Sequence, residues 1–87
     1  MSKKESQFSN ITATATIKTG QGILVGMYVN STSTGTIRFY DNTSAAGTVI
    51  HTVITPSVGY HDLGGANFST GLHAVITSTL DVTLYYY

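Results

Sequence analysis

Hydrophobic and polar residues alternate along much of this chain. In "ITATATIK" (residues 11–18), Ile and Ala alternate with Thr and Lys, which is the period of a β-strand with one apolar and one hydroxyl-bearing face. The segment "ILVGMYV" (residues 23–29) is apolar on both faces, as a central strand is, and its Gly26 indicates a bulge or a close neighbour. The same reasoning predicts further strands at residues 36–41, 48–54, 60–63, 72–78 and 81–87.

Short segments rich in Gly, Ser, Thr and Asn separate these strands, and no helical period is found. About seven short strands at this spacing predict an all-β, antiparallel sandwich or barrel rather than alternating strands and helices. Residues 1–7 show no periodicity and are predicted to form a flexible N-terminal arm. A single β-domain is therefore expected at residues 8–87.

The composition indicates that a monomer would have a small core. A chain of 87 residues buries only roughly 60% of the surface that its unfolded form exposes. Cys is absent, so neither a disulfide nor a thiolate metal site can supplement that core. We therefore expect oligomerisation to supply additional burial.

Charged residues are scarce and unevenly placed. Of eight charged residues, Lys3, Lys4 and Glu5 lie in the first five positions, which leaves Lys18 and Arg38 as the only cations of the predicted domain. Two cations cannot neutralise the phosphates of a nucleic acid, so none is expected as a partner. An uncharged, hydroxyl-rich surface also offers little repulsion against self-association. No signal peptide and no membrane-spanning stretch is recognised, so we expect a soluble protein without a membrane partner.

One loop carries several groups that could hold a metal ion. The stretch "YDNTSAAGTVIHTVI" (residues 40–54) contains Asp41, Asn42, Gly47 and His51. A calcium loop needs several carboxylates at fixed alternation, and only one is present. Asp and Asn bond readily to nearby backbone, and Gly reaches positive φ freely, so the loop is predicted to be the turn of a β-hairpin.

The histidines and acids do not form a recognisable reactive set. His51, His61 and His73 fall on three different predicted strands without the close pair that zinc sites usually contain. Asp62 follows His61 directly, so in a strand the two side chains point to opposite faces. No nucleophile elbow and no phosphate-binding loop is found. We predict a non-enzymatic protein with no catalytic residue, no cofactor and no metal.

The last predicted strand ends in three tyrosines. Tyr85 and Tyr87 share one face of this strand, whereas Tyr86 lies on the other face with Leu84. Tyrosine is favoured at protein interfaces, because its body is apolar and its tip is polar. We therefore predict an oligomer interface at Tyr85, Tyr86 and Tyr87. A row of tyrosines can also stack against sugars, which makes carbohydrate binding an alternative.

Several segments of the chain resemble those of a known group of proteins. The motifs "GTIRFYDNT", "AAGTVI", "FSTGL" and "DVTLYY", in this order, are similar to those of small structural proteins encoded among the virion genes of tailed bacteriophages. The likeness covers roughly residues 8–87. Because these are turn and strand motifs, they indicate the fold of the protein more specifically than its function. The resemblance implies a compact, jelly-roll-like β-sandwich without catalytic residues.

The resemblance also implies a function on the phage particle. It suggests a cement protein that decorates and stabilises the outer capsid as a homotrimer, with the major capsid protein as its partner. Such a protein is made in the cytoplasm of a bacterial host and ends on the capsid surface. The arm with Lys3 and Lys4 is its predicted capsid contact. A tail, fibre or other appendage module is the structural alternative, and a carbohydrate-binding β-sandwich module is the alternative of another class.

Overall fold

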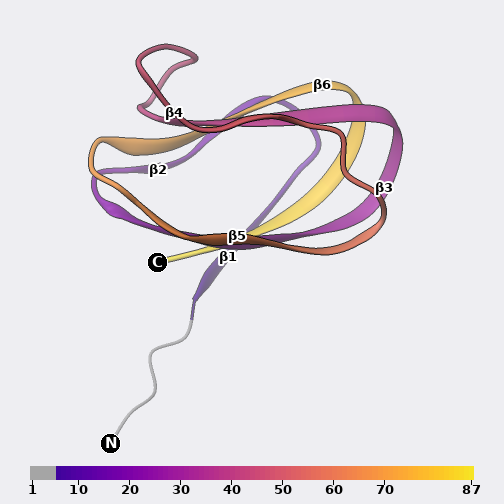
Figure 1. The fold of residues 1–87 in the computed structure, drawn as a ribbon, viewed down its shortest axis with the longest axis horizontal. Coiled ribbons are helices and arrows are strands. Elements are labelled where there is room, and N and C mark those ends of the chain that lie inside the picture. Colours follow the sequence, from indigo (N-terminus) through magenta and orange to yellow (C-terminus); the bar gives the residue numbers. More distant parts are fainter. Residues whose placement is uncertain (1–5) are drawn as a thin grey trace, which may run out of the picture.

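The computed structural model describes residues 6–87 and shows a fold made of antiparallel β-strands (Figure 1). The predicted all-β class is confirmed, and this part of the chain contains no helix that could cross a membrane. The six strands of the described residues are β1 (Gln7–Ile11), β2 (Ala15–Thr19), β3 (Gly22–Asp41), β4 (Thr48–Ile54), β5 (Gly59–Phe68) and β6 (Gly71–Tyr86).

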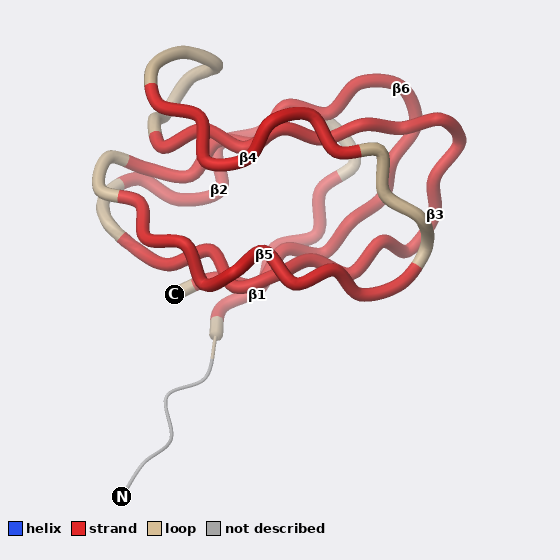
Figure 2. Tube along the Cα trace, in the orientation of Figure 1, coloured by secondary structure: helices blue, strands red, loops and turns tan. Residues whose placement is uncertain are grey.

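Two long strands organise the molecule. Strands β3 and β6 pair antiparallel from Leu24, opposite Tyr86, to Tyr40, opposite His73. One half of this pair is flanked by β5 and β1, and the other half by β4 and β2. The tube view shows that the sheet folds over, so that β4 and β2 lie above and β5 and β1 lie below (Figure 2). Each of the four short strands pairs with only one long strand.

The fold-over lies where both long strands bend. Thr34 and Ser78 have positive φ angles of 55° and 66°, an uncommon conformation for residues other than glycine. The register shifts between Ser33 and Thr34, both of which pair with Thr79. Next to this bulge, a side chain on Gly35 would overlap with the Thr79 carbonyl. The strands can therefore turn together at this point without losing their pairing.

The core lies between the two halves of the folded sheet. Alternate residues of β3 and β6 point into it, since successive side chains of a strand lie on opposite faces. None of the described buried side chains is polar or charged. The buried apolar residues, none more than 4% exposed, are Leu24, Met27, Val29, Ile37, Phe39, Leu63, Phe68, Leu72, Ala74, Leu80, Val82 and Leu84.

The predicted count of seven strands is wrong for the described residues. The predicted strands at 23–29 and 36–41 are both parts of β3, and those at 72–78 and 81–87 are both parts of β6. The Ser, Thr and Gly residues between them resemble a turn in sequence, but their backbone stays paired across the bend. The predicted strand at 11–18 is instead divided between β1 and β2.

The predicted boundary of the arm also shifts. Gln7 belongs to β1, where it pairs with Tyr86, so the ordered sheet begins one residue before the predicted domain. The predicted capsid-contact residues Lys3 and Lys4 lie outside the described residues.

Candidate functional site

An aromatic surface lies on the outer side of the β5–β3–β6–β1 half of the sheet. We call it the aromatic face; it consists of Phe8, Tyr28, Tyr60 and Tyr85. Phe8 is 72% exposed, Tyr60 is 53% exposed and Tyr28 is 43% exposed. Phe8 pairs with Tyr85 across β1 and β6, and Tyr28 pairs with Tyr60 across β3 and β5. Side chains of directly paired residues share a face of the sheet, so the four rings lie together.

Strand alternation explains why these rings point outward. In β6, Leu84 is fully buried, so its neighbour Tyr85 faces outward. In β3, Met27 and Val29 are fully buried, which places Tyr28 between them on the outer side. The core therefore fixes the direction of each ring.

Gly26 makes room for one ring to cross a strand. A side chain on Gly26 would overlap with the hydroxyl end of Tyr60, which comes from the neighbouring strand β5. The Tyr60 ring thereby reaches toward Tyr85, and the two ring centroids lie 6.3 Å apart at a tilt of 46°. This is within the range of favourable aromatic pairs.

A row of polar side chains adjoins the aromatic face. We call it the polar row; it consists of Asn10, Asn30, Asp81 and Thr83. The side-chain amides of Asn10 and Asn30 donate hydrogen bonds to Asp81 Oδ1 at 2.8 and 3.2 Å. Both amides also reach Thr83 Oγ1 at 3.3 Å. The two amides hold Asp81 and Thr83 from both sides.

The polar row keeps unused hydrogen-bond acceptors. Within the described chain, Asp81 Oδ2 and the amide oxygens of Asn10 and Asn30 accept no hydrogen bond. Thr83 pairs directly with Asn10 and with Tyr28, so these acceptors lie beside the rings. The outer surface thus combines exposed aromatic rings with fixed acceptor groups.

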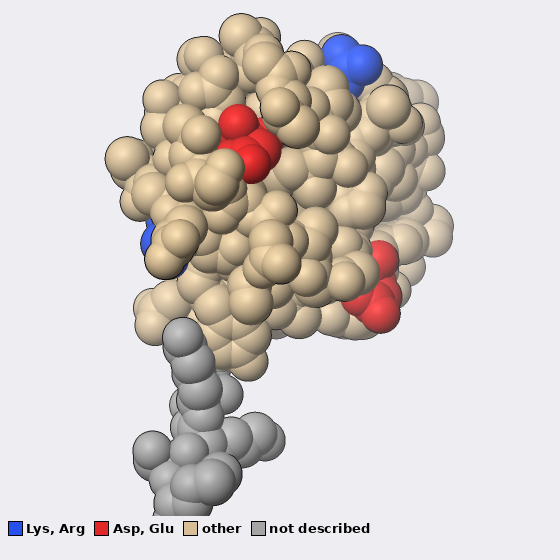
Figure 3. Space-filling view, turned by 60° about the vertical axis from the view of Figure 1, so that its left-hand side comes forward, with Lys and Arg blue, Asp and Glu red and all other residues tan. Residues whose placement is uncertain are grey.

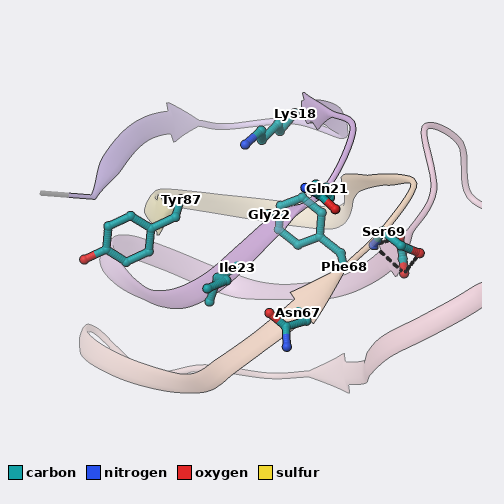
Figure 4. Close-up of a pocket in the computed structure, with 9 residues that line it drawn as sticks. Lys18, Gln21, Gly22, Ile23, Asn67, Phe68, Ser69 and Tyr87 are labelled. Carbon is teal, nitrogen blue, oxygen red and sulfur yellow. Dashed lines mark hydrogen bonds between the residues drawn. The ribbon is translucent and has the colours of Figure 1, made fainter. Parts of the chain in front are cut away.

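A pocket of about 750 Å³ lies at one end of the sheet (Figure 4). Lys18, Gln21 and Asn67 supply its polar groups, and Tyr87 and Ser69 lie at opposite ends of it in the view. Tyr87 is held there by its backbone, which exchanges hydrogen bonds with Ile23 at 2.8 and 3.1 Å. The pairing between the end of the chain and β3 thus continues to Tyr87.

Asp41, at the edge of this pocket, holds a turn in place through hydrogen bonds. Its carboxylate accepts hydrogen bonds from the backbone N–H groups of Ser69, Thr70 and Gly71 at 3.0, 2.8 and 3.3 Å. The bonds from Ser69 and Thr70 lower the pKa of the Asp41 carboxyl below its usual value. Asp41 therefore ties the end of β3 to the β5–β6 turn.

The predicted hairpin turn after Asp41 is confirmed. The Asn42 side chain donates to the Ala46 carbonyl and accepts from the Thr43 backbone N–H, both at 2.8 Å. Gly47 has a φ of 84° where the chain enters β4. These contacts are those of a self-bonded turn.

The three histidines lie apart and each contacts its own partner. Nε2 of His51 donates to the Leu63 carbonyl at 3.0 Å, and Nε2 of His61 donates to the Ser57 carbonyl at 2.7 Å. His73 Nδ1 is hydrogen-bonded to the Thr16 hydroxyl at 2.8 Å. In residues 6–87, no three His, Asp or Glu side chains gather into a group that could hold a metal ion.

The three terminal tyrosines do not form one surface. Tyr85 belongs to the aromatic face, Tyr86 packs against the core, and Tyr87 lines the pocket. The sequence placed Tyr86 on the face opposite to Tyr85, and this is confirmed. It did not identify Phe8, Tyr28 or Tyr60 as neighbours of Tyr85, because they come from three other strands whose order is not written in any local pattern.

The face of the described residues seen in Figure 3 carries isolated charges on a largely uncharged background. Comparison of the chain with protein-family models, curated proteins and solved structures gives no match.

Proposed function

We propose that this chain is a non-enzymatic structural protein that decorates and stabilises the outer capsid of a tailed bacteriophage as a homotrimer. Its fold would be a jelly-roll-like β-sandwich formed by the two halves of the folded sheet. The pairing of two long, bent strands with short strands on both sides supports this architecture.

The main support for the proposal is that the acidic and histidine side chains, which could do chemistry, make structural hydrogen bonds. Asp41 binds three backbone N–H groups, Asp62 accepts a hydrogen bond from the Gly64 N–H at 2.8 Å, and Asp81 is held by two amides. The three histidines each contact a backbone carbonyl or a hydroxyl. These groups hold the structure together, as a rigid and non-reactive building block requires.

The edge strand β4 supports self-association. Among the described residues it pairs only with β3, and its exposed apolar residues include Val49 (36% exposed) and Val53 (56% exposed). Val58, which follows this strand, is 60% exposed. An unpaired edge with apolar side chains and no charge favours contact with another chain. We place the subunit contact here rather than at the predicted Tyr85–Tyr87, because Tyr85, Tyr86 and Tyr87 lie on different surfaces.

Light scattering tests the oligomer. The wild-type protein should have about three times the chain mass at micromolar concentration. Val53→Lys should shift the protein toward the monomer, since it places a charge in the apolar contact. Thr52→Lys, which adds the same charge at the neighbouring exposed position, is the matched control. A stable wild-type monomer would contradict the homotrimer.

Binding to capsids tests the function. Purified protein is added to capsids that lack it, and co-sedimentation and the temperature of capsid disruption are measured. The protein should bind to saturation and raise that temperature, because a trimer gains from several weak contacts at once. A version that begins at Gln7 lacks Lys3 and Lys4 and should bind more weakly. Absence from capsids together with a location at the tail in virion imaging would support the appendage alternative instead.

A further inference from the structure

We propose that the aromatic face and the polar row together form a binding site for a neutral carbohydrate chain. This inference goes beyond the proposed structural role and does not depend on it.

The rings supply the apolar part of such a site. Tyr28 and Tyr60 form a direct cross-strand pair, and Tyr60 crosses Gly26 to reach Tyr85. Tyr28 and Tyr60 stay exposed and Tyr85 is half-buried, although the core residues beneath them are buried. The C–H faces of a sugar ring are apolar and stack on such rings, while each tyrosine hydroxyl stays available for hydrogen bonds.

The polar row supplies hydrogen-bond acceptors in fixed positions. Thr83 lies directly opposite Tyr28, and it is two residues from Tyr85 on the same face of β6. Two residues along a strand correspond to about 6.6 Å, so rings and acceptors lie within the span of a few sugar units. The unused acceptors, Asp81 Oδ2 and the oxygens of Asn10 and Asn30, are suited to sugar hydroxyls, which are good donors.

The same acceptors disfavour a twofold contact of this face with a second copy of this chain. A twofold contact places identical patches against each other, and the trimer contact proposed above lies at β4 and does not use this face. The two Asp81 carboxylates and the two sets of amide oxygens would then meet without donors, and burying acceptors in this way is costly. A bound calcium ion is also disfavoured, because Asp81 is the only carboxylate of the polar row and calcium requires more oxygen ligands.

A glycan array followed by titration calorimetry tests the site. The probes are neutral oligosaccharides built from glucose, galactose, mannose and N-acetylglucosamine. The full chain should bind at least one class. Tyr28→Ala should weaken that binding at least tenfold by removing a stacking ring. Asp81→Asn should weaken it by a similar factor, because it replaces one acceptor oxygen with a donor.

Tyr40→Ala is the matched control, since Tyr40 belongs to the half of the sheet flanked by β4 and β2. It should leave binding unchanged. Thermal unfolding verifies that each variant is folded. Gly26→Ala gives a second test of the site, because it displaces the Tyr60 ring and should also weaken binding.

Three results would overturn the proposal. The first is the absence of binding to every neutral oligosaccharide, and the second is binding that Tyr28→Ala and Asp81→Asn both leave intact. The third is conversion of an oligomer to a monomer by Tyr28→Ala, which would assign the face to a protein contact. The capsid assay is separate: wild-type protein that binds capsids but no sugar would refute this site and keep the proposed structural function.

Discussion

The hydroxyl end of the Tyr60 side chain occupies the space that a side chain on Gly26 would fill. The two residues lie on neighbouring strands, with Tyr60 on β5 and Gly26 on β3. This relationship explains why a glycine lies in the middle of an apolar strand. It also links the packing of the sheet to the arrangement of the aromatic face.

Gly26→Ala should therefore lower the free energy of unfolding by about 1–3 kcal/mol, as overpacking does. In a Tyr60→Ser background the cost should be smaller, because the overlapping hydroxyl is gone. Part of the cost in stability should persist, since the His61 carbonyl also lies 2.9 Å from the Cβ atom that alanine adds at position 26. Urea unfolding of the two single variants and the double variant measures the coupling. Strictly additive costs would contradict the contact.

The Asp41 carboxylate should make stability depend on acid pH. Hydrogen bonds from the Ser69 and Thr70 backbone lower its pKa in the folded state. Its contribution is therefore complete above the ordinary pKa of an aspartate and is lost as the pH falls through the lowered value. Asp41→Asn should flatten the loss of stability between neutral pH and about pH 3, measured by thermal unfolding.

At neutral pH the same variant should cost on the order of 1 kcal/mol, a modest value because the carboxylate lies at the surface. Asp62→Asn is the control: it removes the same charge but concerns only one backbone hydrogen bond, from Gly64. An Asp41→Asn protein as stable as the wild type, with the same acid profile, would contradict the role of Asp41 at the β5–β6 turn.

Replacing a strained residue at the bend should stabilise the fold. Ser78 has a φ of 66°, which glycine adopts freely. Ser78→Gly should raise the free energy of unfolding by about 0.5–1 kcal/mol, net of the greater freedom of glycine in the unfolded chain. Ser44→Gly, in the exposed Asn42–Gly47 turn and without positive φ, should give no such gain. Chemical denaturation compares the two.

The last residues of the chain should contribute unequally to stability. Tyr86 packs against the core, so Tyr86→Ala should cost about 2 kcal/mol, somewhat less than for a fully buried aromatic residue. Tyr87→Ala should cost less, because the Tyr87 side chain lines the pocket at the end of the sheet rather than the core, and its backbone hydrogen bonds to Ile23 remain. Deleting residues 85–87 should lower the melting temperature further than either substitution. Equal effects of the two substitutions would contradict this assignment.

Chelation should leave the melting temperature unchanged. His51, His61 and His73 each have a separate hydrogen-bond partner in the structure. A metal that stabilised the fold would make stability depend on its presence. A fall of several degrees in EDTA, restored by zinc or calcium, would show that a metal site exists.

Local patterns in the sequence determined much of this protein. Period-two alternation predicted the all-β class and the shared face of Leu84 and Tyr86, because the side chains of a strand alternate whatever its neighbours are. The turn after Asp41 was predictable for a similar reason, since Asn42 and Gly47 act on their own backbone.

Only the tertiary structure decided which strands lie side by side. The segment around Thr34 and Gly35 was predicted as a turn, yet it is a bend in one long strand, because its pairing with β6 outweighs the local preference of Ser, Thr and Gly. The aromatic face likewise combines Phe8 and Tyr85, which are far apart in sequence. Such neighbours follow from strand order and register, which are fixed by the packing of the whole core and not by any one segment.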